Sequence, residues 1–251
     1  MNTSSLRSIL LGLSASVFLG ICSNALAADY KITSLDWAPY TNDKLPAQGA
    51  SSAVVTEAFK AAGNTLKIEF YPWSRAVDMA KSDKAYIAYF PEYHSKANEA
   101  DFLYSDPIGV GPLVFVERKS DPVKWDSYDS LKGKKIGVVK GYVNTDELDA
   151  KIASKALTSD EALDDAKNLL KLAAGRVDVA VIDVNVFNYL VKNDAAVKAV
   201  AGQLQVNGKT LEDKKLYVCF KKSPEGEKAL KEFNQGLKKI DPEAIMKKLT
   251  N

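Results

Sequence analysis

Two short apolar runs of the chain end beside residues that can bind a charged ligand. The run 131–141 leads to Tyr142 and Asn144, and the run 175–183 ends at Asp183. Runs of β-branched residues are typical of strands in a parallel sheet covered by helices on both faces. Ligands of such sheets lie at the carboxyl ends of strands, beside helix N-termini whose free N–H groups attract anions. The sequence therefore predicts a ligand cleft here, in which the backbone near Tyr142 and Asn144 can receive a carboxylate.

Strands and helices alternate along the rest of the chain. The patterns predict strands at 30–35, 66–71, 85–90, 113–117 and 215–220. They predict helices at 51–63, 73–81, 95–101, 184–191, 224–240 and 242–249. Two further helices are expected between the cleft strands, one capped by Asn144 and one running from a Thr158 cap to Gly175. The buried stripe of the second would comprise Leu163, Ala166, Leu170 and Ala173.

This order predicts an α/β protein with two lobes. Residues 30–90 follow a βαβαβ pattern, which favours a parallel sheet. The strands at 113–117 and 215–220 are interpreted as crossovers, so that two hinge strands join two lobes. Lobe 1 would comprise residues 28–112 and 217–251, and lobe 2 residues 113–216, each a mostly parallel sheet flanked by helices.

The N-terminal segment is predicted to be a cleavable signal peptide, residues 1–27. Arg7 precedes an apolar stretch at 9–21, and small residues at 25–28 form a cleavage site near Ala27. We therefore expect an exported, periplasmic protein. Cys219 is then the single remaining cysteine, which we expect to be buried. Lysines occur as scattered pairs and the formal charge is only +2, so nucleic acid is not an expected partner.

Five segments together resemble the periplasmic solute-binding proteins of the polar amino-acid ABC-transporter type, often called family 3, which have the type 2 periplasmic binding fold. These segments are Trp37 to Tyr40, Tyr71 to Arg75, Tyr104 to Pro107, Leu131 to Gly137 and Asp178 to Asp183. Their order and spacing behind a signal peptide cover essentially the whole mature chain.

The resemblance implies roles for residues from both lobes. Trp37 takes the place of an aromatic residue that covers the ligand, with Tyr40 beside it, and a rigid aromatic face offers large contact area. Asp183 matches a carboxylate that receives the ammonium group of the ligand. The alternatives are that Trp37 and Tyr40 pack their loop and that Asp183 caps the following helix.

The chain departs from the family at the position that grips the α-carboxylate of the ligand. The family has arginine there, whereas this chain has Asn98, which carries no charge. Either another residue binds the carboxylate, or the ligand is not an ordinary α-amino acid. Arg75 is the candidate substitute, and its alternative role is stacking on Trp73 at the surface.

The segment 89–94 is aromatic where the family carries small hydroxyl residues. Tyr89 and Phe90 could stack on a ring-bearing or cationic ligand, with Glu92 as a counter-charge. His94 is the only histidine, which excludes multi-histidine metal sites, and neither a metal nor a cofactor is expected.

These features favour a monomeric binding protein that closes over a small polar solute, an amino acid or a related amine or carboxylate, for uptake by an inner-membrane ABC permease. One alternative is a dehydratase-like periplasmic enzyme on the same fold, with His94, Glu92 or Asp183 as acid or base. Another is a ligand sensor for a membrane receptor.

Overall fold

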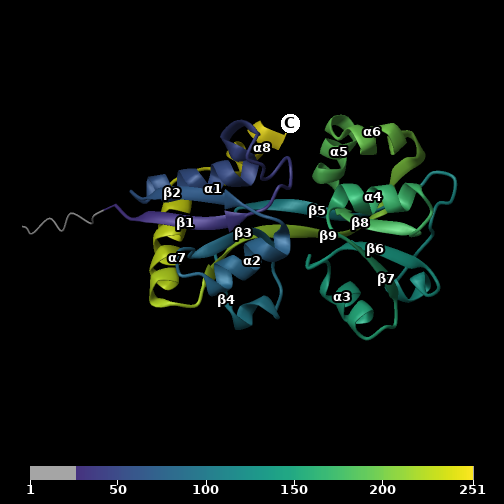
Figure 1. Cartoon of the computed structure of the whole chain (residues 1–251), viewed down its shortest axis with the longest axis horizontal. Helices are drawn as coiled ribbons and strands as arrows, with labels where there is room; N and C mark the ends of the chain where they lie inside the picture. Colours follow the sequence, from purple (N-terminus) through teal and green to yellow (C-terminus); the bar gives the residue numbers. More distant parts are fainter. Residues whose placement is uncertain (1–26, 251) are drawn as a thin grey trace, which may run out of the picture.

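The computed structural model describes residues 27–250, arranged as two lobes with strands running between them (Figure 1). The predicted signal peptide therefore lies outside the described residues, except for Ala27 at its end. Within residues 27–250, no helix combines the length and the apolar character needed to cross a membrane.

Lobe 1 is built on the predicted βαβαβ order. Its parallel strands β1 (Asp29–Ser34), β2 (Thr65–Phe70) and β3 (Ala88–Tyr93) are ordered β2-β1-β3, and α1 (Ala50–Ala61) and α2 (Trp73–Ser82) connect them. The lobe also contains the short strand β4 (Phe102–Tyr104), and α7 (Pro224–Leu237) and α8 (Pro242–Thr250), which pack against α1. Gly236 allows α7 to approach the Ala58 carbonyl of α1 closely, because a side chain there would overlap it.

Lobe 2 repeats the same architecture. Its parallel strands β6 (Lys135–Val139), β7 (Thr158–Ala162) and β8 (Val179–Asp183) are ordered β8-β6-β7. The helices are α3 (Asp146–Ala153), α4 (Asp165–Ala173), α5 (Val184–Asn193) and α6 (Ala195–Val200). Short 3₁₀ turns occur at Pro46–Gln48, Asn98–Ala100, Tyr128–Leu131 and Ala201–Gln203.

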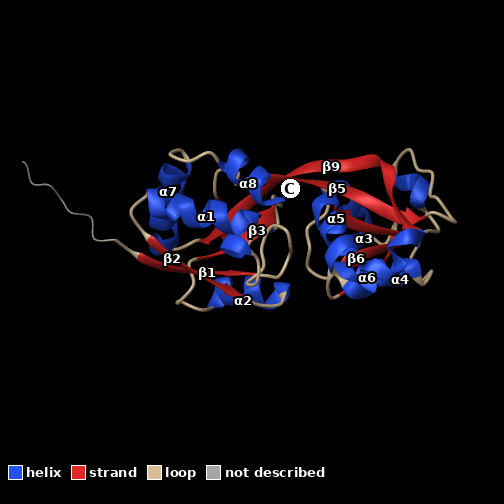
Figure 2. Ribbon diagram, turned by 90° about the horizontal axis from the view of Figure 1, so that it is seen from above, coloured by secondary structure: helices blue, strands red, loops and turns tan. Residues whose placement is uncertain are grey.

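Two long antiparallel strands join the lobes, as Figure 2 shows from above. β5 (Gly109–Arg118) pairs with β8, and β9 (Leu204–Lys221) pairs with β3, β4 and β5, so all nine strands form one continuous sheet. The α/β two-lobe fold with two hinge strands is thus confirmed. The lobe boundaries predicted at 112/113 and 216/217 fall inside β5 and β9 and stay predictions.

The structure corrects the predicted helix from Thr158. Residues Thr158–Ala162 form β7, which pairs with β6, and the helix begins at Asp165 with Asp164 as its N-cap. The buried face consequently includes Leu169 and Leu172, whereas Leu163 is 74% exposed. The prediction was wrong because the alternation of residues 158–162 was not separated from the helical pattern that follows.

Other predicted bounds shift by a few residues. Thr145, and not Asn144, caps α3, accepting a hydrogen bond from the Leu148 N–H. The helix expected at 95–101 is a single turn at Asn98–Ala100, and the strand expected at 85–90 is β3. β9 begins eleven residues before the predicted strand at 215–220.

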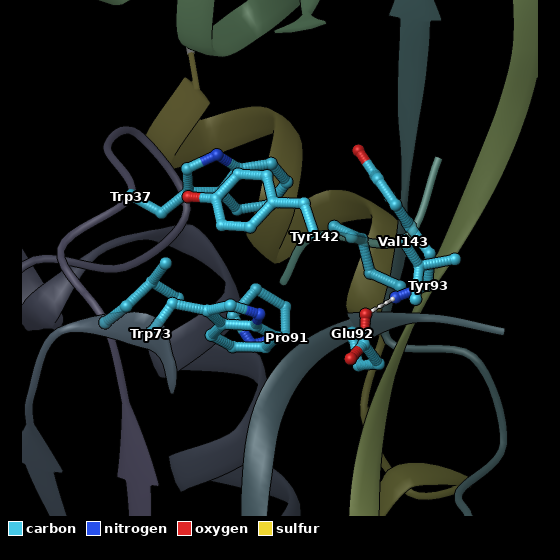
Figure 3. A pocket seen from close by; sticks show the side chains of 9 residues that line it. Trp37, Trp73, Pro91, Glu92, Tyr93, Tyr142 and Val143 are labelled. Atoms are coloured by element: carbon cyan, nitrogen blue, oxygen red, sulfur yellow. Dashed lines mark hydrogen bonds between the residues drawn. The ribbon is translucent and has the colours of Figure 1, made fainter. Parts of the chain in front are cut away.

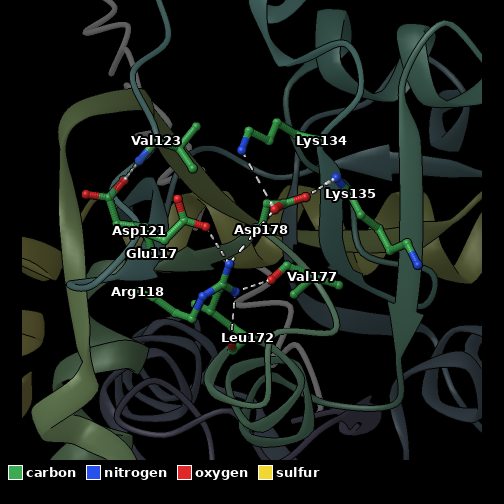
Figure 4. Close-up of polar contacts among 9 residues, drawn as sticks. All are labelled: Glu117, Arg118, Asp121, Val123, Lys134, Lys135, Leu172, Val177 and Asp178. Atoms are coloured by element: carbon green, nitrogen blue, oxygen red, sulfur yellow. Dashed lines mark hydrogen bonds and ion pairs between the residues drawn. The ribbon is translucent and has the colours of Figure 1, made fainter.

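Arg118 fixes the lobe 2 end of β5 (Figure 4). Its guanidinium donates to the carbonyl oxygens of Leu172, at 3.1 Å, and Val177, at 2.6 Å. It also donates to Asp121 at 2.9 Å. The Leu172 carbonyl, which also accepts from the Gly175 N–H, lies at the C-terminus of α4, where a cation is favoured by the helix dipole. Arg118 thereby ties β5, α4 and the chain entering β8 together.

We expect Arg118→Met to lower the free energy of unfolding by about 2 kcal/mol, because two carbonyl oxygens lose a charged donor. Urea denaturation of the variant and of Lys132→Ala measures this. Lys132 carries only an exposed ion pair to Asp129 and serves as the control. Equal stability of the two variants would contradict the role given to Arg118.

Candidate ligand-binding cleft

The cleft lies where the carboxyl ends of the parallel strands of both lobes face each other. Trp37 and Tyr40 follow β1, and Tyr93 ends β3 in lobe 1. From lobe 2, Tyr142 follows β6 and Asp183 ends β8. This is the edge at which open parallel sheets bind ligands, and it brings together residues up to 146 positions apart in the chain.

Six aromatic side chains form the inner surface of this cleft, and we call them the aromatic cluster: Trp37, Tyr40, Trp73, Tyr89, Tyr93 and Tyr142. Trp37 stacks on Tyr40 with ring centroids 4.7 Å apart. The ring of Tyr142 of lobe 2 packs edge to face with those of Trp37 and Trp73, with ring centroids 6.4 and 5.9 Å apart (Figure 3). The two lobes therefore meet through aromatic rings in geometries that such rings favour.

Hydrogen bonds between side chains and backbone of the two lobes cross the cleft. The Tyr40 hydroxyl lies 3.1 Å from both carboxylate oxygens of Asp183. The Trp37 indole N–H donates to Asp165 at 3.1 Å, and the Trp73 indole N–H donates to the Gly141 carbonyl at 2.9 Å. The Tyr93 hydroxyl also donates to Asp183, at 3.3 Å, and the Asn185 amide of lobe 2 donates to the Tyr40 oxygen at 2.7 Å. The lobes are therefore in direct contact at this edge.

Gly111 of β5 leaves room for the Asp183 side chain because it has no side chain of its own. A side chain on Gly111 would overlap Asp183 Oδ2 and lie 3.1 Å from the Tyr93 hydroxyl and 3.3 Å from that of Tyr40. Glycine is thus the residue that lets the hinge strand pass behind the contact between Tyr40 and Asp183.

The two lobe 2 carboxylates are buried and close enough to repel each other. Burial, together with the charge of Asp183, raises the pKa of Asp165 to about 7. Burial likewise raises the pKa of Asp183 to about 7, opposed by hydrogen bonds from the backbone of Asn185 and Val186 and from Tyr40 and Tyr93. Both carboxyl groups are thus costly to ionise without a cation.

Glu92 is a third buried carboxyl group, on the lobe 1 side. It accepts hydrogen bonds from the Tyr93 backbone, the Tyr89 hydroxyl and the Asn98 amide at 2.9, 3.1 and 3.0 Å. Burial nevertheless raises its pKa to about 8. Asn98, which stands where the family has arginine, therefore contacts a carboxyl group of the protein itself.

Asn144, like Asn98, donates hydrogen bonds to a carboxyl group of the protein itself. Its backbone N–H and its side-chain amide both donate to Asp149 of α3, at 2.8 and 2.7 Å. The N–H that was predicted to receive a ligand carboxylate is thus occupied by a carboxylate of the protein.

Three of the predicted or considered residues lie outside the aromatic cluster. Arg75 is on the exposed face of α2, with its guanidinium 5.0 Å from the centre of the Tyr71 ring rather than on Trp73. Phe90 is fully buried in the core of lobe 1, where its carbonyl accepts a bond from Ser34. His94 is partly exposed, pairs with Glu99 and packs against Tyr104.

Sequence reasoning missed Asp165, Trp73 and Tyr93 as cleft residues. Asp165 follows β7, so the rule that selected Asp183 at the end of β8 applies to it equally. It was hidden by the wrong assignment of residues 158–162 to a helix.

The innermost part of the cleft is tightly closed in this arrangement. One cavity of about 20 Å³ is lined by Trp37, Trp73, Glu92, Tyr93 and Tyr142, and a neighbouring one of about 10 Å³ adds Asp165 and Asp183. Each is about the size needed for a single water molecule. Larger cavities lie between the lobes beside these two: one of about 550 Å³ is lined by Trp37, Tyr142 and Asp165, and one of about 640 Å³ by Trp73, Arg75 and Tyr142. A ligand larger than water that contacts Asp183 requires the lobes to separate further than they do in this arrangement.

Known structures show the same fold. A histidine kinase sensor domain similar to periplasmic binding proteins is 17% identical, covers 88% of this chain and 95% of its own, and has a TM-score of 0.74. This chain has the periplasmic-binding-protein fold. An ancestral arginine-binding protein bound to arginine is 17% identical over 88% of this chain and 96% of its own, with a TM-score of 0.70. The GluR0 ligand-binding core from Nostoc punctiforme in complex with L-glutamate is 18% identical over the same shares, with a TM-score of 0.68.

No protein-family model and no curated protein sequence matches this chain. At 17 to 18% identity the structural matches establish the fold, and the ligand has to be argued from the cleft itself. Within residues 27–250, no three His, Cys, Asp or Glu side chains are grouped so as to hold a metal ion.

The first expectation from the cleft concerns Gly111. Gly111→Ala should lower the free energy of unfolding by about 1 to 3 kcal/mol, because the added methyl group overlaps Asp183. Gly208→Ala is the matched control, since a side chain at Gly208 of β9 meets no atom within 4 Å. Chemical denaturation of both variants measures the difference, and equal effects would show that the close approach at Gly111 is unimportant.

The second expectation concerns pH. Between about pH 4 and pH 7 the folded protein holds protons on Asp165 and Asp183 that the unfolded chain has released, so stability should fall as pH rises through this window. Asp165→Asn should flatten this slope and raise the free energy of unfolding at pH 8 by on the order of 2 kcal/mol. Thermal melts from pH 5 to pH 8 test this, and a wild-type stability that rises with pH would contradict it.

Proposed function

We propose that this protein binds a small charged solute between its two lobes and delivers it, in the periplasm, to an inner-membrane ABC permease. The observation that carries the proposal is the set of hydrogen bonds across the cleft, which join Trp37, Tyr40, Trp73 and Tyr93 of lobe 1 to groups of lobe 2. A ligand that contacts both sides shifts the equilibrium between open and closed lobes.

The chemistry of the cleft supports binding. Aromatic faces provide contact area, and a few buried polar groups fix the orientation of a ligand, which is the usual composition of a small-molecule site. Similar structures include an ancestral arginine-binding protein and the GluR0 ligand-binding core in complex with L-glutamate. The predicted signal peptide supports a periplasmic location, and the two hinge strands supply the axis for closure.

A sensor is the second candidate, because one similar structure is the sensor domain of a histidine kinase. In that role the closed lobes would be recognised by a membrane receptor. Capture of partners from solubilised membranes by the liganded protein distinguishes the two, since a permease or a receptor would be retained. An enzymatic role has less support, because His94 lies outside the cavities that hold Glu92 and Asp183.

A thermal-shift screen of amino acids, amines, small carboxylates and short peptides tests the proposal. A ligand at 100 times its dissociation constant adds about 2.7 kcal/mol and should raise the melting temperature by roughly 5 to 10 °C. Melting curves unaffected by every compound would count against binding, and turnover of a hit would favour an enzyme.

Tryptophan fluorescence then locates the site, because two of the three tryptophans belong to the aromatic cluster. The ligand-induced signal should shrink in Trp37→Phe and in Trp73→Phe. It should persist in Trp125→Phe, since Trp125 packs against Phe115 and Tyr128 outside the cluster. A signal that vanishes only in Trp125→Phe would place binding elsewhere.

A further inference from the structure

The buried charges of the cleft are strongly unbalanced. Glu92, Asp165 and Asp183 are each 6% exposed or less, and Asp149 lies behind them against Asn144. Among residues 27–250, Lys214 is the only buried lysine or arginine. It is paired in register with Gly111 on the hinge, with its ammonium 5.7 Å from the centre of the Tyr93 ring. One cation thus stands against four carboxyl groups.

Lys214 is placed to balance the carboxyl groups near the hinge. Its positive charge favours the ionised forms of Glu92 and of Asp149 and so lowers the pKa of each, against the larger opposing effect of burial. It also pairs with Glu212 at 3.4 Å. Asp165 and Asp183, by contrast, receive only neutral donors from the described residues: indole, hydroxyl and backbone N–H groups. The uncompensated negative charge is therefore concentrated between these two side chains.

The buried groups of the cleft that could receive an anion are already occupied by carboxylates of the protein, and the exposed cations Arg75, Lys140 and Lys167 line a separate cavity of about 640 Å³. The Asn98 amide contacts Glu92, and the backbone N–H and amide of Asn144 contact Asp149. The N-termini of α4 and α5 are capped by the carboxylates of Asp164 and Asp183. A ligand carboxylate placed in this cleft would thus meet like charges and would find these donors taken.

The aromatic cluster suits the opposite charge. Trp37 and Tyr142 line both cavities of the cleft, and the second of these cavities also contains Asp165 and Asp183. A cation there can lie against the faces or rims of electron-rich rings while its N–H groups donate to the two carboxylates. The lobes need only separate enough for an ammonium group to replace the Trp37 and Tyr40 donors at those oxygens.

From this geometry we infer that the solute is an organic cation that carries an ammonium group and no carboxylate, held between Asp165 and Asp183 and covered by Trp37 and Tyr142. This inference rests on the proposed binding function and specifies the class of its ligand. It makes decarboxylated amines, rather than α-amino acids, the compounds that fit the cleft.

Matched pairs of compounds test the inference by isothermal titration calorimetry at pH 8. Each pair comprises an amine and its parent amino acid: putrescine and ornithine, cadaverine and lysine, agmatine and arginine, and phenethylamine and phenylalanine. We expect at least one amine to bind at least tenfold more tightly than its parent. If diamines bind more tightly than monoamines of equal length, Glu92 is assigned as the partner of the second ammonium group.

Two neighbouring aspartates provide a matched pair of variants. Asp165→Asn should weaken the best amine at least tenfold, because it removes a buried charge that contacts the ligand. Asp164→Asn makes the same chemical change one position away at an exposed helix cap, a position that asparagine also fills well, and should change affinity less than threefold. Because Asp165→Asn keeps an oxygen for the Trp37 N–H, circular dichroism should show both variants folded.

The outcomes separate the inference from the function on which it rests. Parent amino acids that bind more tightly than their amines, with binding lost in Lys214→Met, would overturn the cationic ligand while leaving the binding function intact. Amine binding that is unchanged in Asp165→Asn would overturn the assigned site. Absence of binding by every amine and every amino acid would instead count against the proposed function itself.

Discussion

The contact between the Tyr40 hydroxyl and the Asp183 carboxylate is the interaction on which the cleft depends. It joins the loop after β1 to the end of β8, and it requires Gly111 of the hinge strand to have no side chain. Asn185 supports it by donating to the Tyr40 oxygen at 2.7 Å, and Tyr93 adds a second hydroxyl to the same carboxylate. Asp183 also caps α5 through the Asn185 and Val186 N–H groups. One carboxyl group thus orders a helix, a hinge and the face of the opposite lobe, so its roles as helix cap and as cleft residue are compatible.

The distribution of charge around this contact determines whether the cleft favours a cationic or an anionic ligand. The buried carboxyl groups are costly to ionise while only neutral donors face them, which favours protonation as the pH falls. A cation removes that cost, whereas an anion increases it. The buried carboxyl groups therefore discriminate between ligands by their charge. The aromatic rings supply contact area with little dependence on the shape of the ligand.

Much of this arrangement could be predicted from the sequence because strand ends are recognisable. The rule that ligands lie at the carboxyl ends of parallel strands located Tyr142 and Asp183 in the chain, and the resemblance to the family located Trp37. The structure places all three beside one cavity of the cleft. The same rule failed at Asp165 only because β7 was taken for part of a helix.

Arg75 lies two residues after Trp73 in α2. Residues two apart lie on nearly opposite faces of a helix, so Arg75 is exposed to solvent when Trp73 is buried. The pairing of Asn98 with Glu92 and of Asn144 with Asp149 required the tertiary structure, because the sequence shows which groups can donate but not which acceptor reaches them first.

A double-mutant cycle between Tyr40 and Asp183 tests the central contact most directly. The single variants Tyr40→Phe and Asp183→Asn and the double variant are compared with the wild type by urea denaturation at pH 8, where Asp183 is largely ionised. A hydroxyl bonded to a buried carboxylate across the cleft should give a coupling free energy of about 1 to 3 kcal/mol. Effects that add to within about 0.3 kcal/mol would show that the two residues do not interact across the lobes, and would contradict the central role of this contact in the cleft.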